Sequence, residues 1–234
     1  MRTAGFEDAP TQISAAEGYR LWAPTYDSLP NTLTTLERRI LSSRLEHING
    51  RVVLDVGCGT GRWMADAAAK GAKTVGVDLS VEMLAVAGSK PQLAGRLIQA
   101  DGCVLPISDG CVDIVICSFS LGYVDFPELM LHEFGRVARH GGTIMVSDLH
   151  PLARLMGWRR SFRSGARVFE IESHSYTSEQ LVSCGRRAGL ELREIFEPHL
   201  SEPERLIMRI AGKEAFFDGL SAIPAVLALI WQRP

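Results

Sequence analysis

The sequence has little net charge, no cysteine pair with metal-site spacing and no long apolar run. Its formal charge is −2 over 234 residues, which gives no general electrostatic reason to expect binding to nucleic acid. Five cysteines stand at positions 58, 103, 111, 117 and 184. Because none has the close spacing of a zinc or redox motif, we expect free, mostly buried thiols in a reducing cytoplasm and no metal.

No segment is typical of a membrane span or a secretory signal. Residues 1–12 lack an apolar core and are interpreted as a frayed start. The longest late apolar run, Ile223–Trp231, contains Pro224 and is far too short to cross a bilayer. We therefore expect a soluble, cytoplasmic protein with no membrane partner.

The most informative segment present is Leu54–Trp63, with the sequence LDVGCGTGRW. An apolar run that ends at Val56 predicts a buried strand, and a helix-like run opens at Arg62. Three alternating glycines lie between them, so bare backbone approaches a ligand at a helix N-terminus. This order of strand, glycine turn and helix predicts a ligand site.

Two residues of this segment indicate which ligand the turn prefers. The dinucleotide fingerprint Gly-x-Gly-x-x-Gly requires Gly or Ala where Arg62 stands. Asp55, just ahead of the first glycine, would repel a diphosphate and favours a cation or amine. S-adenosylmethionine supplies both an ammonium and a sulfonium.

Short apolar strands alternate with helical segments along the chain. We expect strands at about 51–56, 74–78, 96–100, 112–118, 143–147, 190–196 and 226–231, and helices at about 33–47, 61–70, 81–88, 128–139, 177–188 and 202–219, the last interrupted at Gly212. This alternation predicts a parallel sheet that is covered on both faces.

Acidic residues follow successive strands. Asp78, at the end of the second strand, has the position of an acid that binds ribose hydroxyl groups. Asp101-Gly102, after the third strand, is placed where a carboxylate accepts from an adenine amino group. The alternative is that each aspartate merely caps the next turn, but three such acids after three strands favour a nucleoside site.

The chain resembles class I S-adenosylmethionine-dependent methyltransferases, most of all the small-molecule, type 11 group. The resemblance covers roughly 50–148 and rests on Leu54–Gly61, Gly76–Ser80, Ala100–Gly102, Asp113–Ser118 and Arg136–Gly142. In addition, Tyr19–Asp27 resembles the N-terminal signature that folds over the cofactor in this group.

That resemblance implies an α/β, Rossmann-like seven-stranded sheet of order 3-2-1-4-5-7-6, with strand 7 antiparallel and helices on both faces. It further implies one methyltransferase domain over 1–234. Within it we expect an N-terminal helical lid (1–48), a cofactor-binding core (49–148), a substrate lid after strand 5 (149–176) and the C-terminal part of the sheet (177–234).

The resemblance also implies the cofactor, S-adenosylmethionine, with S-adenosylhomocysteine as product. Gly57, Gly59 and Asp55 would receive its methionine part and Asp78 its ribose, while Ser118 would face its carboxylate. The expected cofactor-binding set is Tyr19, Trp22, Tyr26, Asp55, Gly57, Cys58, Gly59, Asp78, Leu79, Met83, Ala100, Asp101, Gly102, Ser118, Phe119 and Ser120.

Methyl transfer to a small-molecule O, N or C nucleophile depends mainly on proximity and orientation, and a base is needed only where the nucleophile must lose a proton. His150 is the candidate base, with the alternative that it is a loop histidine bonded to backbone beside Pro151. His174 and Tyr176 form a second candidate catalytic pair.

Aromatic and basic residues outside the core have two interpretations each. Tyr19, Trp22 and Tyr26 form an aromatic wall beside the sulfonium, or they fix the first helix to the core. The arginines at 154–167 meet an anionic acceptor, or they belong to a solvated lid. Trp158 indicates that this lid packs on substrate, on 202–219 or on a second subunit, so a homodimer stays open.

Three competing functions remain. The chain is a regulatory or scaffold module that binds the cofactor without turnover, because no residue is certain to be catalytic. A nicotinamide dehydrogenase is supported by fold analogy alone, and Asp55 and Arg62 speak against it. Nucleic-acid methylation is disfavoured because Ser118–Leu121 stands where such enzymes have Asn-Pro-Pro-Tyr or Asp-Pro-Pro-Tyr.

Overall fold

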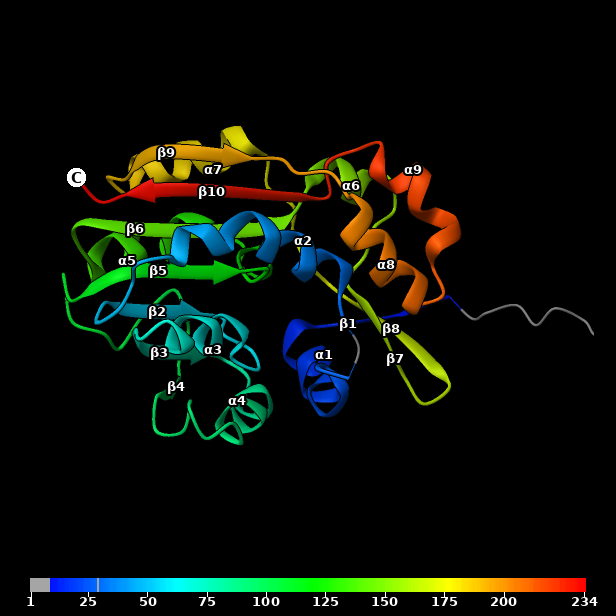
Figure 1. Ribbon diagram of the computed structural model, residues 1–234, viewed down its shortest axis with the longest axis horizontal. Coiled ribbons are helices and arrows are strands. Elements are labelled where there is room, and N and C mark those ends of the chain that lie inside the picture. The colour runs from blue at the N-terminus through cyan, green and yellow to red at the C-terminus, as the bar shows by residue number, and fades with distance from the viewer. Residues whose placement is uncertain (1–8, 29) are drawn as a thin grey trace, which may run out of the picture.

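The structure, a computed structural model, describes residues 9–28 and 30–234. Seven strands form one sheet, in the order β4-β3-β2-β5-β6-β10-β9 (Figure 1). In chain order these are β2 (Val52–Val56), β3 (Lys73–Asp78), β4 (Leu97–Gln99), β5 (Val112–Ser118), β6 (Ala138–Leu149), β9 (Glu191–Phe196) and β10 (Val226–Gln232). Since β10 is antiparallel to both β6 and β9, the expected order 3-2-1-4-5-7-6 with strand 7 reversed is confirmed.

Alternate residues of each strand face two separate layers of helices. Leu54 and Val115 join one buried cluster, with Phe134 of α5 (Pro127–Val137) and with α7 (Ser178–Arg187). Their neighbours Val53 and Ile114 join a second cluster, with α2 (Thr32–Leu41) and α3 (Arg62–Ala69). The sheet is therefore covered on both faces, as a strand that is apolar throughout requires.

The helices begin and end at residues that satisfy their free backbone groups. Ser80 accepts from the Met83 N–H at the start of α4 (Val81–Gly88), and Thr177 forms a capping box at the start of α7. Gly71, with φ +83°, follows α3 in the left-handed conformation that ends many helices. These three helix ends therefore carry residue types that favour helix termini.

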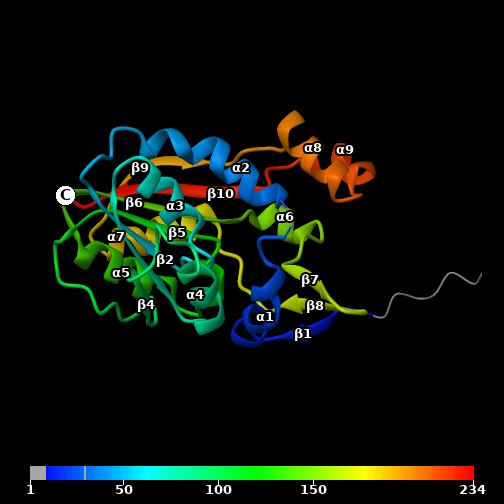
Figure 2. The ribbon, with the colours of Figure 1, turned by 60° about the horizontal axis from the view of Figure 1, so that its bottom comes forward.

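A second, smaller sheet lies beyond the carboxyl ends of the parallel strands (Figures 1 and 2). The strands β7 (Ser161–Ser164) and β8 (Arg167–Ile171) form an antiparallel hairpin, and β1 (Thr11–Ile13) adds to β8 in parallel. Beside it lie α1 (Ala15–Trp22) and η1 (Ala23–Thr25). Residues 11–13 are therefore a paired strand and not part of a frayed start, because their partner lies far along the sequence.

Three further boundaries differ from those expected. The helix expected at 33–47 divides into α2 and the 3₁₀ turn η2 (Ser42–Leu45). β6 begins at Ala138 instead of 143, because Gly141 and Gly142 exchange hydrogen bonds with Arg233 beyond β10. Residues 202–219 form α8 (Glu202–Ile210), η4 (Glu214–Phe216) and α9 (Phe217–Ser221), interrupted at Gly212 as expected.

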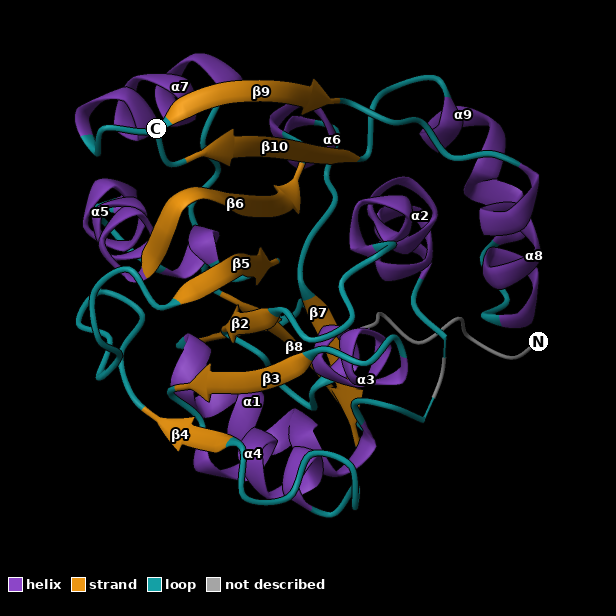
Figure 3. Ribbon diagram, turned by 60° about the vertical axis from the view of Figure 1, so that its left-hand side comes forward, coloured by secondary structure: helices purple, strands orange, loops and turns teal. Residues whose placement is uncertain are grey.

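The remaining elements connect the sheet to its C-terminal half. The turn η3 (Leu121–Tyr123) follows β5, and α6 (Pro151–Leu155) follows β6. Figure 3 shows α8 and α9 outside α2, on the same side of the sheet. Among the described residues, no helix has the length and apolar character needed to cross a membrane.

Candidate functional site

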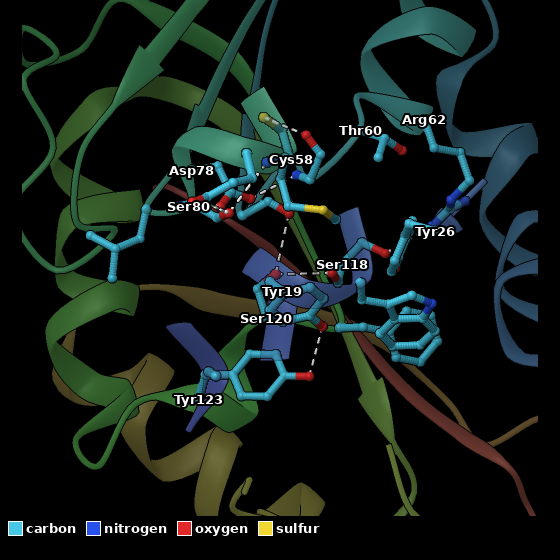
Figure 4. Close-up of a pocket in the computed structure, with 18 of the residues that line it drawn as sticks. Tyr19, Tyr26, Cys58, Thr60, Arg62, Asp78, Ser80, Ser118, Ser120 and Tyr123 are labelled. Carbon is cyan, nitrogen blue, oxygen red and sulfur yellow. Dashed lines mark hydrogen bonds between the residues drawn. The ribbon is translucent and has the colours of Figure 1, made fainter. Parts of the chain in front are cut away.

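A pocket of about 1480 Å³ lies at the carboxyl ends of β2, β3, β4 and β5 (Figure 4). Its floor is the glycine turn after β2 and its roof is α1 with η1. The first residues of β7 and residues of the turn after α8 also line it. Because pockets for one drug-sized ligand occupy about 300–1,000 Å³, this volume accommodates a nucleoside and a second small molecule together.

The glycine turn takes a conformation that other residues rarely adopt. Gly57, Gly59 and Gly61 have φ values of +70°, +53° and +81°. A Cβ atom on Gly57 would lie 2.1 Å from the Ser120 Oγ atom. The glycine at 57 is therefore required both by backbone conformation and by the close approach of the β5 loop.

Asp78 supports this turn from the end of β3. One carboxylate oxygen accepts from the Gly59 N–H at 2.7 Å, and the other accepts from the Ser80 N–H at 2.8 Å. Burial raises the pKa of Asp78, and these two backbone donors oppose that rise. Each oxygen keeps a second lone pair, so the carboxylate can hold the turn and accept from a ligand hydroxyl group.

Asp55 is a buried acid in the floor of the pocket. Asp55 is 2% exposed, and its Oδ1 atom has no hydrogen-bond partner among residues 9–28 and 30–234. Burial raises the pKa of this carboxyl to about 7, while the nearby Arg62 guanidinium acts in the opposite direction. An acid with one unsatisfied oxygen at this position suits a cationic ligand group.

The opposite end of the pocket is more open and more apolar. Leu79 is 63% exposed, whereas Met83 is buried and lies 3.3 Å from the position of a Cβ on Gly59. Asp101 accepts from the Cys103 N–H at 2.8 Å. Ala100 and Gly102 complete this wall, which places apolar side chains beside one acid.

A buried carboxylate from α2 anchors the other wall. Glu37 is 1% exposed and accepts hydrogen bonds from Arg62, from Trp63 Nε1 at 3.3 Å and from the Ser147 hydroxyl. Arg62 also donates to Ser118 Oγ at 2.9 Å. This network was missed at the sequence level, although a glutamate on the apolar face of a helix, four residues after Leu33, was a signal for it.

A second contact fastens the N-terminal segment to the glycine turn. Asp27 accepts from the Thr60 hydroxyl at 2.8 Å and from Lys90 Nζ at 2.9 Å. Lys90 also donates to the Thr60 carbonyl at 2.7 Å. The roof is therefore tied to the floor at the end of the pocket where Thr60 lies.

Aromatic rings form the roof above the glycine turn. Trp22 stacks on Phe162 of β7 with centroids 4.8 Å apart, and it meets Tyr26 edge to face at 4.9 Å. Tyr19 contacts Tyr123 of η3 through both ring and hydroxyl group. Burial raises the pKa of Tyr26 to about 12, so these rings are neutral and present π faces and hydroxyl donors to the pocket.

The turn after β5 is held in an unusual conformation by a residue of the 149–176 segment. Phe119 has φ +53°, in the left-handed region that only a few per cent of non-glycine residues adopt. Arg160 donates to the Phe119 carbonyl and pairs with Asp148, which accepts from the Gly122 N–H at 2.8 Å. Such strain is found where surrounding contacts impose it, typically at functional sites.

All sixteen residues of the expected cofactor-binding set line this single pocket. They come from the ends of four strands, from α4, which carries Met83, and from α1 with the adjoining turn. Figure 4 labels six of them: Tyr19, Tyr26, Cys58, Asp78, Ser118 and Ser120. The close spacing of motifs along the sequence thus corresponds to one continuous cavity. Cys58 is buried in the turn, and burial raises the pKa of its thiol, which suits a small filler.

The three expected catalytic residues are placed differently, and none of them lines the pocket. His150 is buried, its Nδ1 accepts from the Leu152 N–H at 3.1 Å, and its Nε2 lies 3.3 Å from Glu197. It therefore caps α6, as the backbone-bonded alternative describes. His174 pairs with Asp125 at 2.9 Å, and Tyr176 donates to the Val124 carbonyl. All three side chains therefore lie outside the lining of this pocket, and a catalytic role for any of them stays a prediction.

The arginines of the 149–176 segment also separate. Arg160 is buried against Tyr123 and Asp148, whereas Arg159 pairs with Glu170 at 3.4 Å. Among residues 9–28 and 30–234, no group of three or more His, Cys, Asp or Glu side chains has the arrangement of a metal site. Three cysteines are buried, one is half-buried and one is exposed, and all five are free, as expected.

Comparison with known proteins agrees with this geometry. Residues 54–146 match the family model described as a methyltransferase domain. The chain is 34% identical over 134 residues to the malonyl-[acyl-carrier protein] O-methyltransferase of Pectobacterium atrosepticum, a match that covers 57% of this chain and 52% of that protein. It is 32% identical over 156 residues to the demethylmenaquinone methyltransferase of Renibacterium salmoninarum, covering 64% and 65%.

A solved structure shares the fold over most of the chain. The S-adenosylmethionine-dependent methyltransferase from Mesorhizobium loti superposes with a TM-score of 0.68 and 21% identity, covering 87% of this chain and 100% of that one.

Residues 54–146 thus match the type 11 methyltransferase-domain family, and the chain has the same fold as the S-adenosylmethionine-dependent methyltransferase from Mesorhizobium loti. The chain spans about half the length of the Pectobacterium relative that it matches.

Proposed function

We propose that this protein transfers the methyl group of S-adenosylmethionine to a nucleophile on a small-molecule acceptor. One observation carries the proposal: the unsatisfied buried carboxylate of Asp55 lies beside a glycine turn in the same pocket as Asp78 and Asp101. A diphosphate is repelled by such a set of acids, whereas an amino acid joined to a nucleoside satisfies each of them.

Different residues of the pocket bind different parts of the cofactor. Asp55 and the Gly57 and Gly59 backbone receive the methionine ammonium end, and the Arg62–Ser118 pair faces its carboxylate. Asp78 accepts from the ribose hydroxyl groups. The remaining members of the expected set border the adenine or cover it as the roof. In this assignment, residues 49–148 form the cofactor core, while the N-terminal segment to residue 48 and residues 149–176 act as lids.

The chemistry asks little of the protein beyond orientation. When bound, the cofactor supplies an activated methyl group on a positive sulfur. The protein holds the acceptor near attack distance, about 3–3.5 Å, and on the line opposite the sulfur. Trp22 and Tyr26 shield that line from water and present ring faces to the positive charge.

The charges that line the pocket favour an anionic acceptor. Acids gather on the strand-end wall, where Asp55, Asp78 and Asp101 lie. Arg20 of α1 and Lys213, in the turn after α8, also line the pocket, and neither forms an ion pair within the described part of the chain. The two curated relatives are named for malonyl-[acyl-carrier protein] and for demethylmenaquinone, so the names alone do not give one acceptor class.

Calorimetric titration with S-adenosylhomocysteine tests the cofactor assignment. We expect binding to the unaltered chain, and we expect Asp78→Ala to weaken it by about 1–3 kcal/mol, because the Gly59 N–H and a ligand hydroxyl lose their acceptor. Asp218→Ala is the control, since Asp218 lies on exposed α9. Absence of binding at millimolar ligand would end the proposal, and unchanged affinity in D78A would refute the ribose assignment.

A second candidate function is a cofactor-binding regulatory or scaffold module without turnover. It is favoured by the placement of every described histidine outside the pocket, which leaves no general base of the usual kind. The two candidates are separated by incubation with radiolabelled S-adenosylmethionine and a panel of acceptors. Tight cofactor binding without any labelled product supports the module, and one acceptor with repeated turnover excludes it.

A further inference from the structure

Two tyrosine hydroxyl groups meet at the end of the pocket that is remote from the adenine wall. Tyr19 of α1 and Tyr123 of η3 have hydroxyl oxygens 2.7 Å apart, and their rings meet edge to face at 5.4 Å (Figure 4). Tyr123 follows β5, whereas Leu79 and Asp101 follow β3 and β4, on the other side of β2. The tyrosine pair therefore lies where the acceptor has room beside the cofactor.

One proton of this pair has no acceptor in the protein. Two hydroxyl groups carry two protons, and the bond between them uses one. Arg160 lies over the Tyr123 ring with its central carbon 4.5 Å from the centroid, but a guanidinium group only donates. Among the described residues no other hydrogen-bond acceptor contacts the two hydroxyl groups, so one O–H remains able to donate to a ligand in the pocket.

The pair is a donor and not a base. Burial raises the pKa of Tyr19 well above its ordinary value, and the nearby Tyr123 acts in the same direction. No histidine of the described residues lines the pocket. An acceptor that enters already ionised needs no base, and such an acceptor suits a pair that donates.

The charge behind the pair suits an anion. Arg160 is held in place by Asp148 and by the Phe119 carbonyl, with both side chains of the ion pair largely buried. Because it is fixed against Tyr123, it polarises that hydroxyl toward donation. Arg20 and Lys213 add positive charge to the lining of the same pocket.

We propose that the Tyr19–Tyr123 pair binds the acceptor through a carboxylate group, and that the methylated product is its ester; this rests on the proposed methyl transfer. A carboxylate has two oxygens, so the pair holds one and leaves the other free to attack. The free oxygen forms a bond to the methyl carbon, the carbon–sulfur bond breaks, and sulfur keeps its electron pair. The negative charge of the acceptor and the positive charge of sulfur disappear together, and no proton moves.

The test compares two probes of equal shape, 1-naphthoate and the neutral 1-naphthamide, titrated into the full chain saturated with S-adenosylhomocysteine. We expect naphthoate to bind at least about tenfold more tightly, because a hydrogen bond to a charged group is the stronger one. Y19F and Y123F each remove one oxygen and keep the ring, and each is expected to reduce this preference to about threefold or less. S221A is the control, since it also removes one hydroxyl group, and Ser221 donates to the Asp218 carbonyl outside the pocket.

Equal affinity for the two probes in the unaltered chain would overturn the inference, and so would failure of both to bind at millimolar concentration. A preference that persists in Y19F and Y123F would overturn the role of the pair. If either variant fails to fold by circular dichroism, the ratio in the unaltered chain still decides the matter. If the unaltered chain does not bind S-adenosylhomocysteine, that separate result refutes the proposed function itself.

Discussion

Replacement of Glu37 by Gln tests whether the carboxylate beneath the roof holds the pocket together. The side chain accepts from three donors, Arg62, Trp63 and the Ser147 hydroxyl, and it has no exposed surface. An amide of the same shape can place its oxygen toward Arg62 and Trp63 and its nitrogen toward the hydroxyl oxygen. The substitution therefore removes the charge and keeps the contacts.

The size of the effect follows from these contacts. Hydrogen bonds to charged groups contribute about 1.5–3 kcal/mol, against about 0.5–1.5 for neutral ones, so we expect E37Q to lower the free energy of unfolding by about 1–3 kcal/mol. Glu37→Ala leaves the donors unpaired and Arg62 without its counter-charge, which costs about 3–5 kcal/mol. The affinity for S-adenosylhomocysteine should fall in both variants, because Arg62 also holds Ser118 at the pocket wall.

Urea denaturation and calorimetry measure the two quantities. Glu194→Gln is the matched control, because Glu194 pairs with Arg44 at 2.6 Å but both side chains are more than a third exposed. Such a surface pair contributes under about 1 kcal/mol. If E37Q destabilises the protein no more than E194Q does, and leaves the cofactor affinity unchanged, the argument for this network is refuted.

Two further predictions concern the floor of the pocket. Burial raises the pKa of Asp55 to about 7, so between about pH 4 and 7 the folded chain holds a proton that the unfolded chain has released. The free energy of unfolding therefore falls as the pH rises across this window, by roughly 4 kcal/mol at most. Asp55→Asn should abolish this part of the pH dependence in urea denaturation. An identical slope in both proteins would contradict the shift. Gly57→Ala should lower cofactor affinity at least about tenfold, because the added Cβ would lie 2.1 Å from the Ser120 side chain. Gly50→Ala is the control: with φ +76° and no neighbour within 4 Å, it should cost only about 1–2 kcal/mol of stability. Equal cofactor affinity in the two variants would refute the steric argument.

The core of the fold and the cofactor wall were predictable because their signals are local. A strand that ends in Asp55 and three glycines fixes its own turn, and the carboxyl ends of parallel strands meet at one edge. Asp78 and Asp101 therefore come together without any knowledge of tertiary contacts. The helix caps at Ser80 and Thr177 are likewise local patterns.

The acceptor side was not predictable to the same degree, because its contacts are distant in sequence. Thr11–Ile13 pairs with residues about 158 positions later, and nothing in a three-residue segment indicates such a partner. The sequence places His150 just after a strand, where a general base could lie. In the structure its ring accepts a hydrogen bond from the Leu152 N–H and so caps α6. The sequence does not distinguish Arg160 from the four other arginines between 154 and 167, whereas the structure shows that it pairs with Asp148.

The parallel ladder between β1 and β8 joins the N-terminal segment to the 149–176 segment. Ile171 of β8 is fully buried and packs against Gly18 of α1. The ladder and this contact therefore hold the two segments together. A molecule that shifts the hairpin must also shift the helix that carries Tyr19 and Trp22. A ligand that contacts one of these segments is thus coupled, through the ladder, to a ligand that contacts the other.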